Sequence, residues 1–314
     1  MREDLTHWIA LSRTDGVGPK LLRALIDRFG SPEDALAAPE AELLQVKRLG
    51  PTLAERIASA PKSLEAIETE LAMLRENEVE VLTWADEGYP RNLLSVDDAP
   101  PVLYVRGNVG AADEFSVAIV GSRECSEAGY ELAQDLSAVL AECGVTVVSG
   151  FAQGIDSAAH QGALRGRGRT LAVLGSGIGV VPAGQRELAE GVASHGALLS
   201  ELQPMTPPSG PTLMARDRIL SALSRGVIVI EATTDSGTMD TVDRARKQGR
   251  LLWAIDWPEW EERHSGNRAL RKGGAERLSP EVVLDEVDQV VAALQAFELP
   301  TAEEPGPQQR SLFG

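Results

Sequence analysis

The chain has 314 residues, of which 43% are hydrophobic, so it is long enough for about two domains with their own apolar cores. Its 30 basic and 47 acidic residues give a net charge of -17, which argues against a protein that binds nucleic acid over its whole surface. We find no run of about 18 apolar residues, no secretory signal pattern and only two cysteines, outside any metal-ligand spacing, so we expect a reduced cytoplasmic protein without a membrane span or a metal.

The charge is unevenly distributed along the chain. Residues 160–280 contain 16 Lys or Arg and 13 Asp or Glu, which leaves 14 basic and 34 acidic residues elsewhere. This near-neutral stretch can bind phosphate locally, because charges act over about one Debye length, roughly 8 to 10 Å.

Residues 1–65 are predicted to form a small all-α domain of short helices separated by glycine turns. One helix follows Gly16–Pro19, a second begins at Ser31–Glu33, and a third follows Leu49–Pro51. The two glycine-proline turns resemble paired helix-hairpin-helix units in a SAM-like arrangement, whose backbone N–H groups bind phosphates. A helical bundle for protein contacts is the alternative, and the acidity of the region favours it slightly.

Residues 66–115 are predicted to form a connector that packs on the next domain. A long helix over about 61–77 leads to a short strand at 79–82. Turn-rich segments around Gly88–Pro90 and Asp97–Pro101 then precede a second short strand at 102–105.

A regular alternation of strands and helices begins near residue 117. The apolar runs cover 117–120, 145–148, 170–174, 197–199, 227–230 and 251–255, and each of the first five precedes a loop and a helical pattern. Such alternation needs crossover connections, so it predicts an α/β domain over 116–297 with a doubly wound, mostly parallel sheet. A last amphipathic helix at about 281–296 precedes residues 298–314, whose Pro, Glu and Gln content predicts a disordered tail.

The loops after several predicted strands carry residues suited to anions. In an open parallel sheet, ligands bind beyond the carboxyl ends of the strands. These loops contain Gly121–Arg123, Ser149–Asp156, Gly175–Gly177, Glu231 and Asp235–Thr238. Glycine permits close backbone approach, a hydroxyl donates to phosphate oxygen, and arginine offers paired donors. Together the loops predict an anion-binding rim along one sheet edge.

No catalytic constellation accompanies these loops. The first strand is not followed by G-x-G-x-x-G, and the chain lacks a G-x-x-x-x-G-K-S/T loop, a nucleophile-elbow serine and an H-E-x-x-H pair. His160 lies one helical turn after Asp156, and a contact between these side chains within the helix is favoured over catalysis. We therefore expect no catalytic residue, no cofactor and no enzymatic activity.

Several motifs together resemble the DprA (Smf) family of DNA-processing proteins. They match in order and spacing over roughly residues 5–280 and comprise Tyr89–Pro90, Pro100–Gly107, Ala118–Arg123, Ser149–His160, Arg216–Ser224, Glu231–Ala232 and Ser236–Thr238. The resemblance implies a small helical N-terminal domain and an extended Rossmann-like domain, usually in a homodimer. It also implies a single-stranded DNA-binding recombination mediator that helps to load the RecA recombinase in DNA processing and natural transformation.

Carried over by position, the resemblance implies a DNA-phosphate-binding rim. Its residues would be Gly121, Ser122, Arg123, Gly150, Phe151, Gln153, Gly154, Arg216, Arg218, Ser236, Gly237 and Thr238. Phe151 is a candidate for stacking on a base, with a buried core phenylalanine as the alternative. Arg165–Arg169 and Arg244–Arg250 are basic segments, for which a solvated turn and a solvated helix face are the alternatives.

The chain departs from the family pattern Phe-Pro-x-Arg-Asn-Arg. Leu213 and Met214 replace the aromatic residue and the proline, and Asp217 replaces the asparagine. The loss of an aromatic ring can remove a stacking contact worth about 1–3 kcal/mol per base. A carboxylate at position 217 would repel phosphate unless it pairs with Arg216 or Arg218.

The C-terminal residues carry a further short motif. Gln309–Phe313 resembles the peptide by which bacterial replication and repair proteins dock on the sliding clamp, with Gln309, Leu312 and Phe313 as the contacts. Chance similarity, or packing of this peptide back on the domain, is the alternative.

Two other functions stay open on the sequence. Ser236–Thr241 resembles the Gly-Gly-x-Gly-Thr loop of nucleoside-monophosphate phosphoribohydrolases, without its double glycine and its following glutamate. The chain would then be an enzyme or sensor for a nucleotide or phosphoribosyl ligand. A protein-binding scaffold is the third candidate, because the net charge is strongly negative.

Overall fold

The structure is a computed structural model that describes residues 4–258, 261–281 and 283–300. The chain forms two compact units. One holds the described residues up to Tyr89 together with Asp97–Leu103, and the other holds Pro90–Val96 and Tyr104–Pro300. Within the described residues the chain therefore crosses between the units three times, and the segment 66–115 is shared by both.

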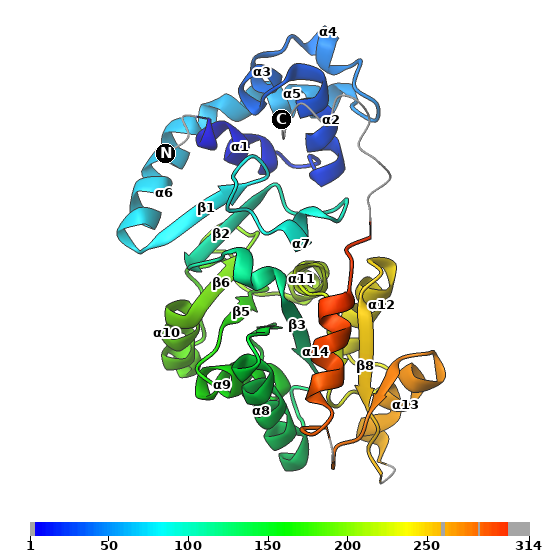
Figure 1. Cartoon of the computed structure of the whole chain (residues 1–314). Coiled ribbons are helices and arrows are strands. Elements are labelled where there is room, and N and C mark those ends of the chain that lie inside the picture. The colour runs from blue at the N-terminus through cyan, green and yellow to red at the C-terminus, as the bar shows by residue number, and fades with distance from the viewer. Residues whose placement is uncertain (1–3, 259–260, 282, 301–314) are drawn as a thin grey trace. The chain divides into compact units, whose positions relative to one another are not determined.

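Short helices make up most of the first unit (Figure 1). They are α1 (Leu5–Ser12), α2 (Pro19–Phe29), α3 (Pro32–Ala37), α4 (Glu40–Leu43), α5 (Pro51–Ser59), the 3₁₀ helix η1 (Ala60–Ser63) and α6 (Leu64–Glu76). The two glycine-proline turns begin α2 and α5, because proline suits the first helical position, where its missing N–H has no partner to lose. Leu22, Leu25 and Ile57 are fully buried and form part of the apolar core of this unit.

Within the described residues, nine strands form one sheet in the order β1-β2-β6-β5-β4-β3-β7-β8-β9. They are β1 (Val79–Thr83), β2 (Val102–Gly107), β3 (Ser116–Val120), β4 (Thr146–Ser149), β5 (Thr170–Val173), β6 (Gly196–Ser200), β7 (Gly226–Val229), β8 (Leu251–Ile255) and β9 (Glu276–Leu278). The pairs from β6 to β9 are parallel, whereas β2 pairs with β6 in the antiparallel sense. The prediction of a mostly parallel α/β sheet is confirmed.

Helices cover the sheet of the second unit. They are α7 (Arg91–Leu94), η2 (Ala111–Glu114), α8 (Glu127–Glu142), α9 (Ile155–Arg165), η3 (Ala183–Gln185), α10 (Arg186–His195), α11 (Gly210–Leu223), α12 (Thr238–Lys247), η4 (Glu262–His264), α13 (Ser265–Lys272) and α14 (Val287–Ala296). Helices α8, α9 and α14 share an apolar cluster with Val117, Ile119 and Ile228 of the sheet. Alternation along each strand directs Ala118 and Val227 to the opposite face, where α11 and α12 pack.

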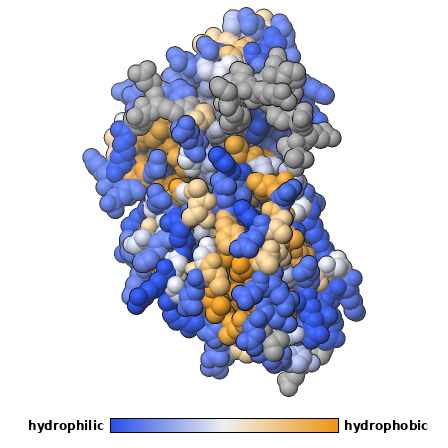
Figure 2. Space-filling model, in the orientation of Figure 1, coloured by the Kyte–Doolittle hydropathy of each residue, from blue (hydrophilic) through white to orange (hydrophobic). Residues whose placement is uncertain are grey.

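The strand order reverses beside β3, whose two neighbours are β4 and β7. Such a switch point, at the carboxyl ends of the strands, is where ligands bind in open α/β sheets. The loops after β3, β4 and β7 all begin at this edge, so the fold brings three of the predicted anion-binding loops together. Figure 2 shows a largely hydrophilic face on this unit, interrupted by apolar surface. Val139 of α8 and Val291 and Ala293 of α14 are partly buried hydrophobic residues that pack against the core.

Candidate functional site

The loops after β3 and β4 contact each other directly. Ile155 N donates a hydrogen bond to Ser122 O at 3.2 Å, and a Cβ placed on Gly154 would lie 2.4 Å from that same oxygen. Gly154 has a φ of 76°, so glycine provides both the left-handed backbone and the close approach. A Cβ on Gly121 would lie 2.6 Å from Ile155 Cγ1. The structure therefore brings Gly121–Arg123 and Gly150–Gly154 to one place, at the N-terminus of α9.

Arg123 is the exposed cation of these two loops. Its side chain has no ion-pair partner in the described part of the chain, and its charge acts on the nearby carboxyl of Asp156. Burial raises the pKa of Asp156, while Arg216, the Ala152 N–H and Arg123 oppose that shift. The guanidinium of Arg123 is therefore available to an anion beside α9, whose N-terminus adds a favourable dipole.

Phe151 lies inside the loop after β4. Its side chain is 5% exposed and its ring packs against His160 with the ring centroids 5.7 Å apart, so it belongs to the core, which is the alternative that the sequence left open. Its φ of 61° is unusual for a residue with a Cβ and costs about 1–3 kcal/mol. Gln153, two residues further on, is exposed.

Arg216 lies beneath the loops. Its guanidinium donates to Val173 O and packs against Gly150, where a Cβ would lie 2.1 Å from Nη1. Arg216 Nε forms an ion pair with Asp217 Oδ1 at 3.0 Å, without the angle of a hydrogen bond. Since the residue is only 6% exposed, it does not extend the rim outward, contrary to the sequence prediction. Glycine at position 150 is needed because it makes room for this inward side chain.

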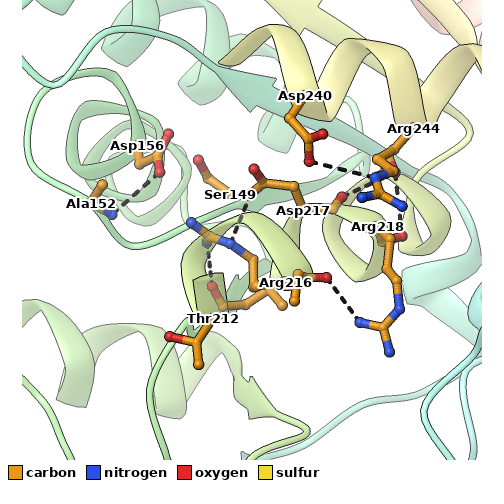
Figure 3. A network of polar contacts seen from close by, with 12 residues as sticks. Ser149, Ala152, Asp156, Thr212, Arg216, Asp217, Arg218, Asp240 and Arg244 are labelled. Atoms are coloured by element: carbon orange, nitrogen blue, oxygen red, sulfur yellow. Dashed lines mark hydrogen bonds and ion pairs between the residues drawn. The ribbon is translucent and has the colours of Figure 1, made fainter. Parts of the chain in front are cut away.

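Asp217 completes a buried polar network (Figure 3). Its carboxylate pairs with Arg216, accepts from the Thr241 hydroxyl and lies near Asp156 and Asp240. Burial raises the pKa of Asp217 to about 6, with Asp156 and Asp240 adding to the rise and Arg216 and Thr241 opposing it. Asp217 therefore pairs with Arg216, one of the two arginines named as possible partners in the sequence analysis.

The remaining predicted residues of the rim are engaged within the protein. Arg218 forms two contacts of 2.6 Å with the Glu201 carboxylate after β6. Ser236 Oγ donates to Thr233 O at 2.9 Å, and Gly237 and Thr238 begin α12. Arg218 can therefore reach an anion only by leaving Glu201.

A buried carboxylate fills the switch point between β3 and β7. Glu231 is fully buried and accepts from Ser126 N at 3.0 Å and from Ser126 Oγ at 2.8 Å, so it caps the N-terminus of α8. Its backbone oxygen accepts from Ser122 N at 2.7 Å. Because this carboxylate already serves the N-terminus of α8, the N-terminus of α9 is the better place for an external anion.

His160 contacts a different residue from the one that the sequence predicted. Its Nδ1 lies 2.7 Å from Thr170 Oγ1, and no hydrogen bond joins it to Asp156 in the described part of the chain. The Thr170 hydroxyl donates to Val147 O, so His160 Nδ1 is the donor of the pair. Burial, aided by the charge of Arg216, lowers the pKa of His160 to about 3, which keeps the ring neutral.

The two basic segments are largely engaged within the protein, and Arg244 pairs with Asp240 at 3.5 Å. Arg165 and Arg169 pair with Asp135 and Asp113, while Arg167 is exposed at the start of β5, the opposite edge of the sheet. Arg250 is not on a solvated face: it is 6% exposed and donates to Asn92 O, Ser95 Oγ and Ala222 O. Burial lowers the pKa of Arg250 to about 10.

Arg186 is a candidate site residue that the sequence analysis missed. It is the first residue of α10, it is exposed, and its side chain has no ion-pair partner among the described residues. The preceding Gln185 donates to Ser157 Oγ at 3.0 Å, and Ser157 Oγ donates to Ala152 O at 2.7 Å. These contacts place the start of α10, where Arg186 lies, near the first turn of α9. No glycine motif marks Arg186, so only the fold reveals its place.

Gln309, Leu312 and Phe313 lie outside the described residues. Across the described ranges, no helix is both long and apolar enough to cross a membrane.

Comparison with known proteins gives consistent matches. Residues 80–290 match the family model of DNA recombination-mediator protein A, and residues 9–82 match that of a SAM-like helix-hairpin-helix tandem. The chain is 34% identical over 299 residues to Protein Smf of Synechocystis sp., an alignment that covers 93% of this chain and 73% of that protein.

Two solved structures are similar to this fold over most of the chain. One is the X-ray structure of DNA processing protein A from Streptococcus pneumoniae, with a TM-score of 0.73, 30% identity and coverage of 90% of this chain and 97% of that one. The other is DNA processing protein A from Helicobacter pylori, with a TM-score of 0.60, 26% identity and coverage of 68% and 97%. The latter structure was described for its single-stranded DNA binding mode.

Proposed function

Because the chain belongs to the DNA recombination-mediator protein A (DprA/Smf) family, we propose that it is a non-catalytic mediator that binds single-stranded DNA and presents it to RecA. The observation that carries this proposal is the pair of contacting loops after β3 and β4, with Arg123 exposed beside the N-terminus of α9. The binding mode described for the Helicobacter pylori relative supports the same ligand.

The proposed contacts are to the phosphates of the strand. Arg123 and Arg186 supply exposed guanidinium groups near the start of α9, and the first turn of this helix supplies backbone N–H groups that lack intrahelical acceptors. Because such contacts address the backbone, they give little base preference. In this proposal the phosphates are bound without being cleaved, and the buried, neutral His160 takes no part in contacting them.

A filter-binding titration at two ionic strengths tests the proposal. Single-stranded oligothymidylate should bind more tightly than a duplex, and log affinity should fall with log salt by about 0.7 per neutralised phosphate. Arg123→Ala should weaken binding and reduce that slope by about 0.7. Arg167→Ala removes an exposed arginine from the opposite sheet edge, one with no ion-pair partner among the described residues, and serves as the matched control. Absence of binding to unpaired oligomers in dilute buffer would refute the function.

RecA and a second copy of the chain are the proposed partners, in the cytoplasm, in DNA processing and natural transformation. A homodimer would hold one strand at two sites and so raise affinity through effective concentration. Sedimentation of the purified chain should give twice the monomer mass. The protein should also speed RecA assembly on single strands, and Arg123→Ala should lose this effect in proportion to its loss of DNA binding.

The C-terminal motif supports a separate proposal, docking on the sliding clamp through Gln309, Leu312 and Phe313. Deletion of residues 309–314 should abolish clamp pull-down and leave oligomer binding intact. Arg310→Ala changes a position that the motif leaves free and should keep the pull-down. Unchanged pull-down after the deletion ends this idea.

A thermal-shift screen separates the mediator from the ligand-binding enzyme or sensor. The mediator should be stabilised by oligomers and not by mononucleotides. Stabilisation by a nucleotide or a phosphoribosyl compound alone, near its cellular concentration, would favour the enzyme, while no shift with either class would favour a protein-binding scaffold.

A further inference from the structure

A group of charged side chains, most of them buried, includes Arg216, which packs against Gly150 of the proposed phosphate loops. Arg216 and Asp217 come from α11, Asp156 from α9, and the half-buried Asp240 from α12 (Figure 3). Asp156 and Asp217 are each 8% exposed, so water screens their charges poorly. The guanidinium of Arg216 is the cation in direct contact with Asp217.

The other titratable groups near Asp217 are either paired with an opposite charge or neutral. Asp240 pairs with Arg244 at 3.5 Å, Arg218 is held by Glu201, and His160 is neutral. Arg123 acts on Asp156 from the loop above. With Asp217 ionised, Arg216 is neutralised by its neighbour and offers little net positive charge to the loop above. With Asp217 protonated, Arg216 loses this ion-pair partner and keeps its contact with Val173 O, and Asp156 is the remaining carboxyl of the group on which its charge acts.

We propose that Asp217 is a positioning residue for DNA binding: it is the internal counter-ion that sets how much of the positive charge of Arg216 acts on a phosphate bound above Gly150. This inference rests on the proposed function. Single-stranded DNA then binds more tightly when Asp217 carries a proton, and by reciprocity a bound strand favours the protonated carboxyl.

The environment of Asp217 makes the change accessible near neutral pH. Burial, with the nearby Asp156 and Asp240, raises the pKa of Asp217 to about 6. The fraction of protonated Asp217 therefore grows as the pH falls through about 6, in the range where the DNA phosphates themselves stay ionised. A phosphate placed above Gly150 adds negative charge and moves the pKa of Asp217 in the same upward direction.

The decisive experiment compares Asp217→Asn with Asp243→Asn in oligothymidylate binding from pH 5 to pH 8 at constant ionic strength. Asp243 is an exposed residue of α12, so its variant changes the net charge equally without touching the buried group. Wild type and Asp243→Asn should gain affinity on acidification, on the order of threefold to tenfold for one charge acting through the protein. Asp217→Asn should bind at pH 8 as tightly as wild type does at pH 5 and show a flatter pH profile.

Two further measurements test whether Asp217 is the group that titrates. Asp240→Asn removes a neighbouring charge that raises the pKa of Asp217, so it should shift the midpoint of the wild-type pH profile to lower pH. Calorimetry in buffers of different ionisation enthalpy should detect proton uptake on binding near pH 6.5 in wild type and less uptake in Asp217→Asn. Parallel pH profiles for Asp217→Asn and Asp243→Asn overturn the role of Asp217 and leave the proposed function standing, whereas absent binding at every pH overturns both.

Discussion

At the level of single residues, the glycines of the loops are explained by close packing. Gly150 makes room for the Arg216 guanidinium, Gly154 for Ser122 O, and Gly121 for the Ile155 side chain. Each contact fixes the position of a loop relative to its neighbour. The glycine motifs therefore organise the candidate site, and the proposed contacts with the ligand fall to the exposed arginines.

Gly150→Ala should destabilise the protein through this packing. A Cβ would lie 2.1 Å from Arg216 Nη1, so the buried guanidinium must move and lose its contacts, at a cost of about 1–3 kcal/mol. Thermal unfolding should therefore show a clear fall in Tm, together with weaker oligomer binding. Gly184→Ala is the matched control because a Cβ there meets nothing within 4 Å. Equal Tm values for the two variants would contradict the packing argument.

His160 should make the protein less stable in mild acid. Its pKa is about 3 in the folded protein and near 6.5 without the fold, so the unfolded chain takes up the proton first. The contribution of neutral His160 to the free energy of unfolding is complete above about pH 6.5 and declines as the pH falls toward 3. The pKa of Asp217 is raised in the folded protein, so its effect on stability has the opposite pH dependence. Its contribution to the free energy of unfolding is present below pH 3.8 and is lost as the pH rises through about 6.

The measurement is Tm between pH 4.5 and pH 7.5 for wild type and His160→Gln. Because Asp217 is present in both proteins, its contribution cancels in the difference. His160→Gln should have a lower Tm than wild type near pH 7 and a smaller loss of Tm on acidification. A His160→Gln profile as steep as that of wild type would show that His160 titrates normally.

At the level of elements, the two helices next to the switch point have different N-termini. Glu231 occupies the N-terminus of α8, whereas that of α9 is bordered by Arg123 and Arg186. Anions are stabilised at helix N-termini by aligned peptide dipoles and free N–H groups. In the proposed function, α9 is the element that receives the strand, and α10 contributes a cation to it.

Arg186→Ala should weaken oligothymidylate binding if α10 contributes a phosphate contact. The slope of log affinity against log salt should fall by about 0.7, as for one phosphate lost. The double variant with Arg123→Ala should lose about twice that slope, while Arg167→Ala should leave it unchanged. The same filter-binding assay checks all three. A wild-type slope for Arg186→Ala would remove α10 from the site.

At the level of the whole molecule, the net negative charge disfavours the approach of DNA, and only the region of the candidate site is close to neutral. The net charge is -17, although residues 160–280 hold 16 basic and 13 acidic residues. Long-range steering is therefore weak, and affinity must come from short-range contacts formed after encounter.

Stopped-flow kinetics should reflect this charge distribution. Between about 50 mM and about 200 mM salt, the association rate constant for oligothymidylate should change by less than about threefold, because local attraction and global repulsion are screened together. The dissociation rate constant should then carry most of the salt dependence. A steep fall in the association rate with salt would instead indicate strong electrostatic steering.

Much of the fold could be predicted, because strands buried on both faces of a parallel sheet are near-continuous apolar runs in the sequence. Each apolar run from 117 to 255 became a strand, with bounds within one residue or two. Strand β9 was missed because two of its three residues, Glu276 and Arg277, are exposed and charged. The helix-hairpin-helix turns were likewise recognisable from Gly18–Pro19 and Gly50–Pro51.

The direction of individual side chains could not be predicted. Arg216 and Arg218 lie on a helix with little apolar periodicity, so nothing local shows that one enters the core and the other binds Glu201. Arg250 likewise has the residue type of a solvated face, although carbonyl oxygens distant in sequence hold it inside. Such placements depend on partners that only the folded chain brings near.

The path of the chain between its two units has a practical consequence for dissecting the protein. Pro90–Val96 belongs with the later residues, although the chain returns to the first unit before Tyr104. Asn92 and Ser95 from this short excursion supply two of the three oxygens that receive the Arg250 guanidinium. A fragment that starts at residue 104 or 116 would leave the buried Arg250 guanidinium without two of its hydrogen-bond acceptors. Expression trials of the second unit should therefore begin upstream of Pro90.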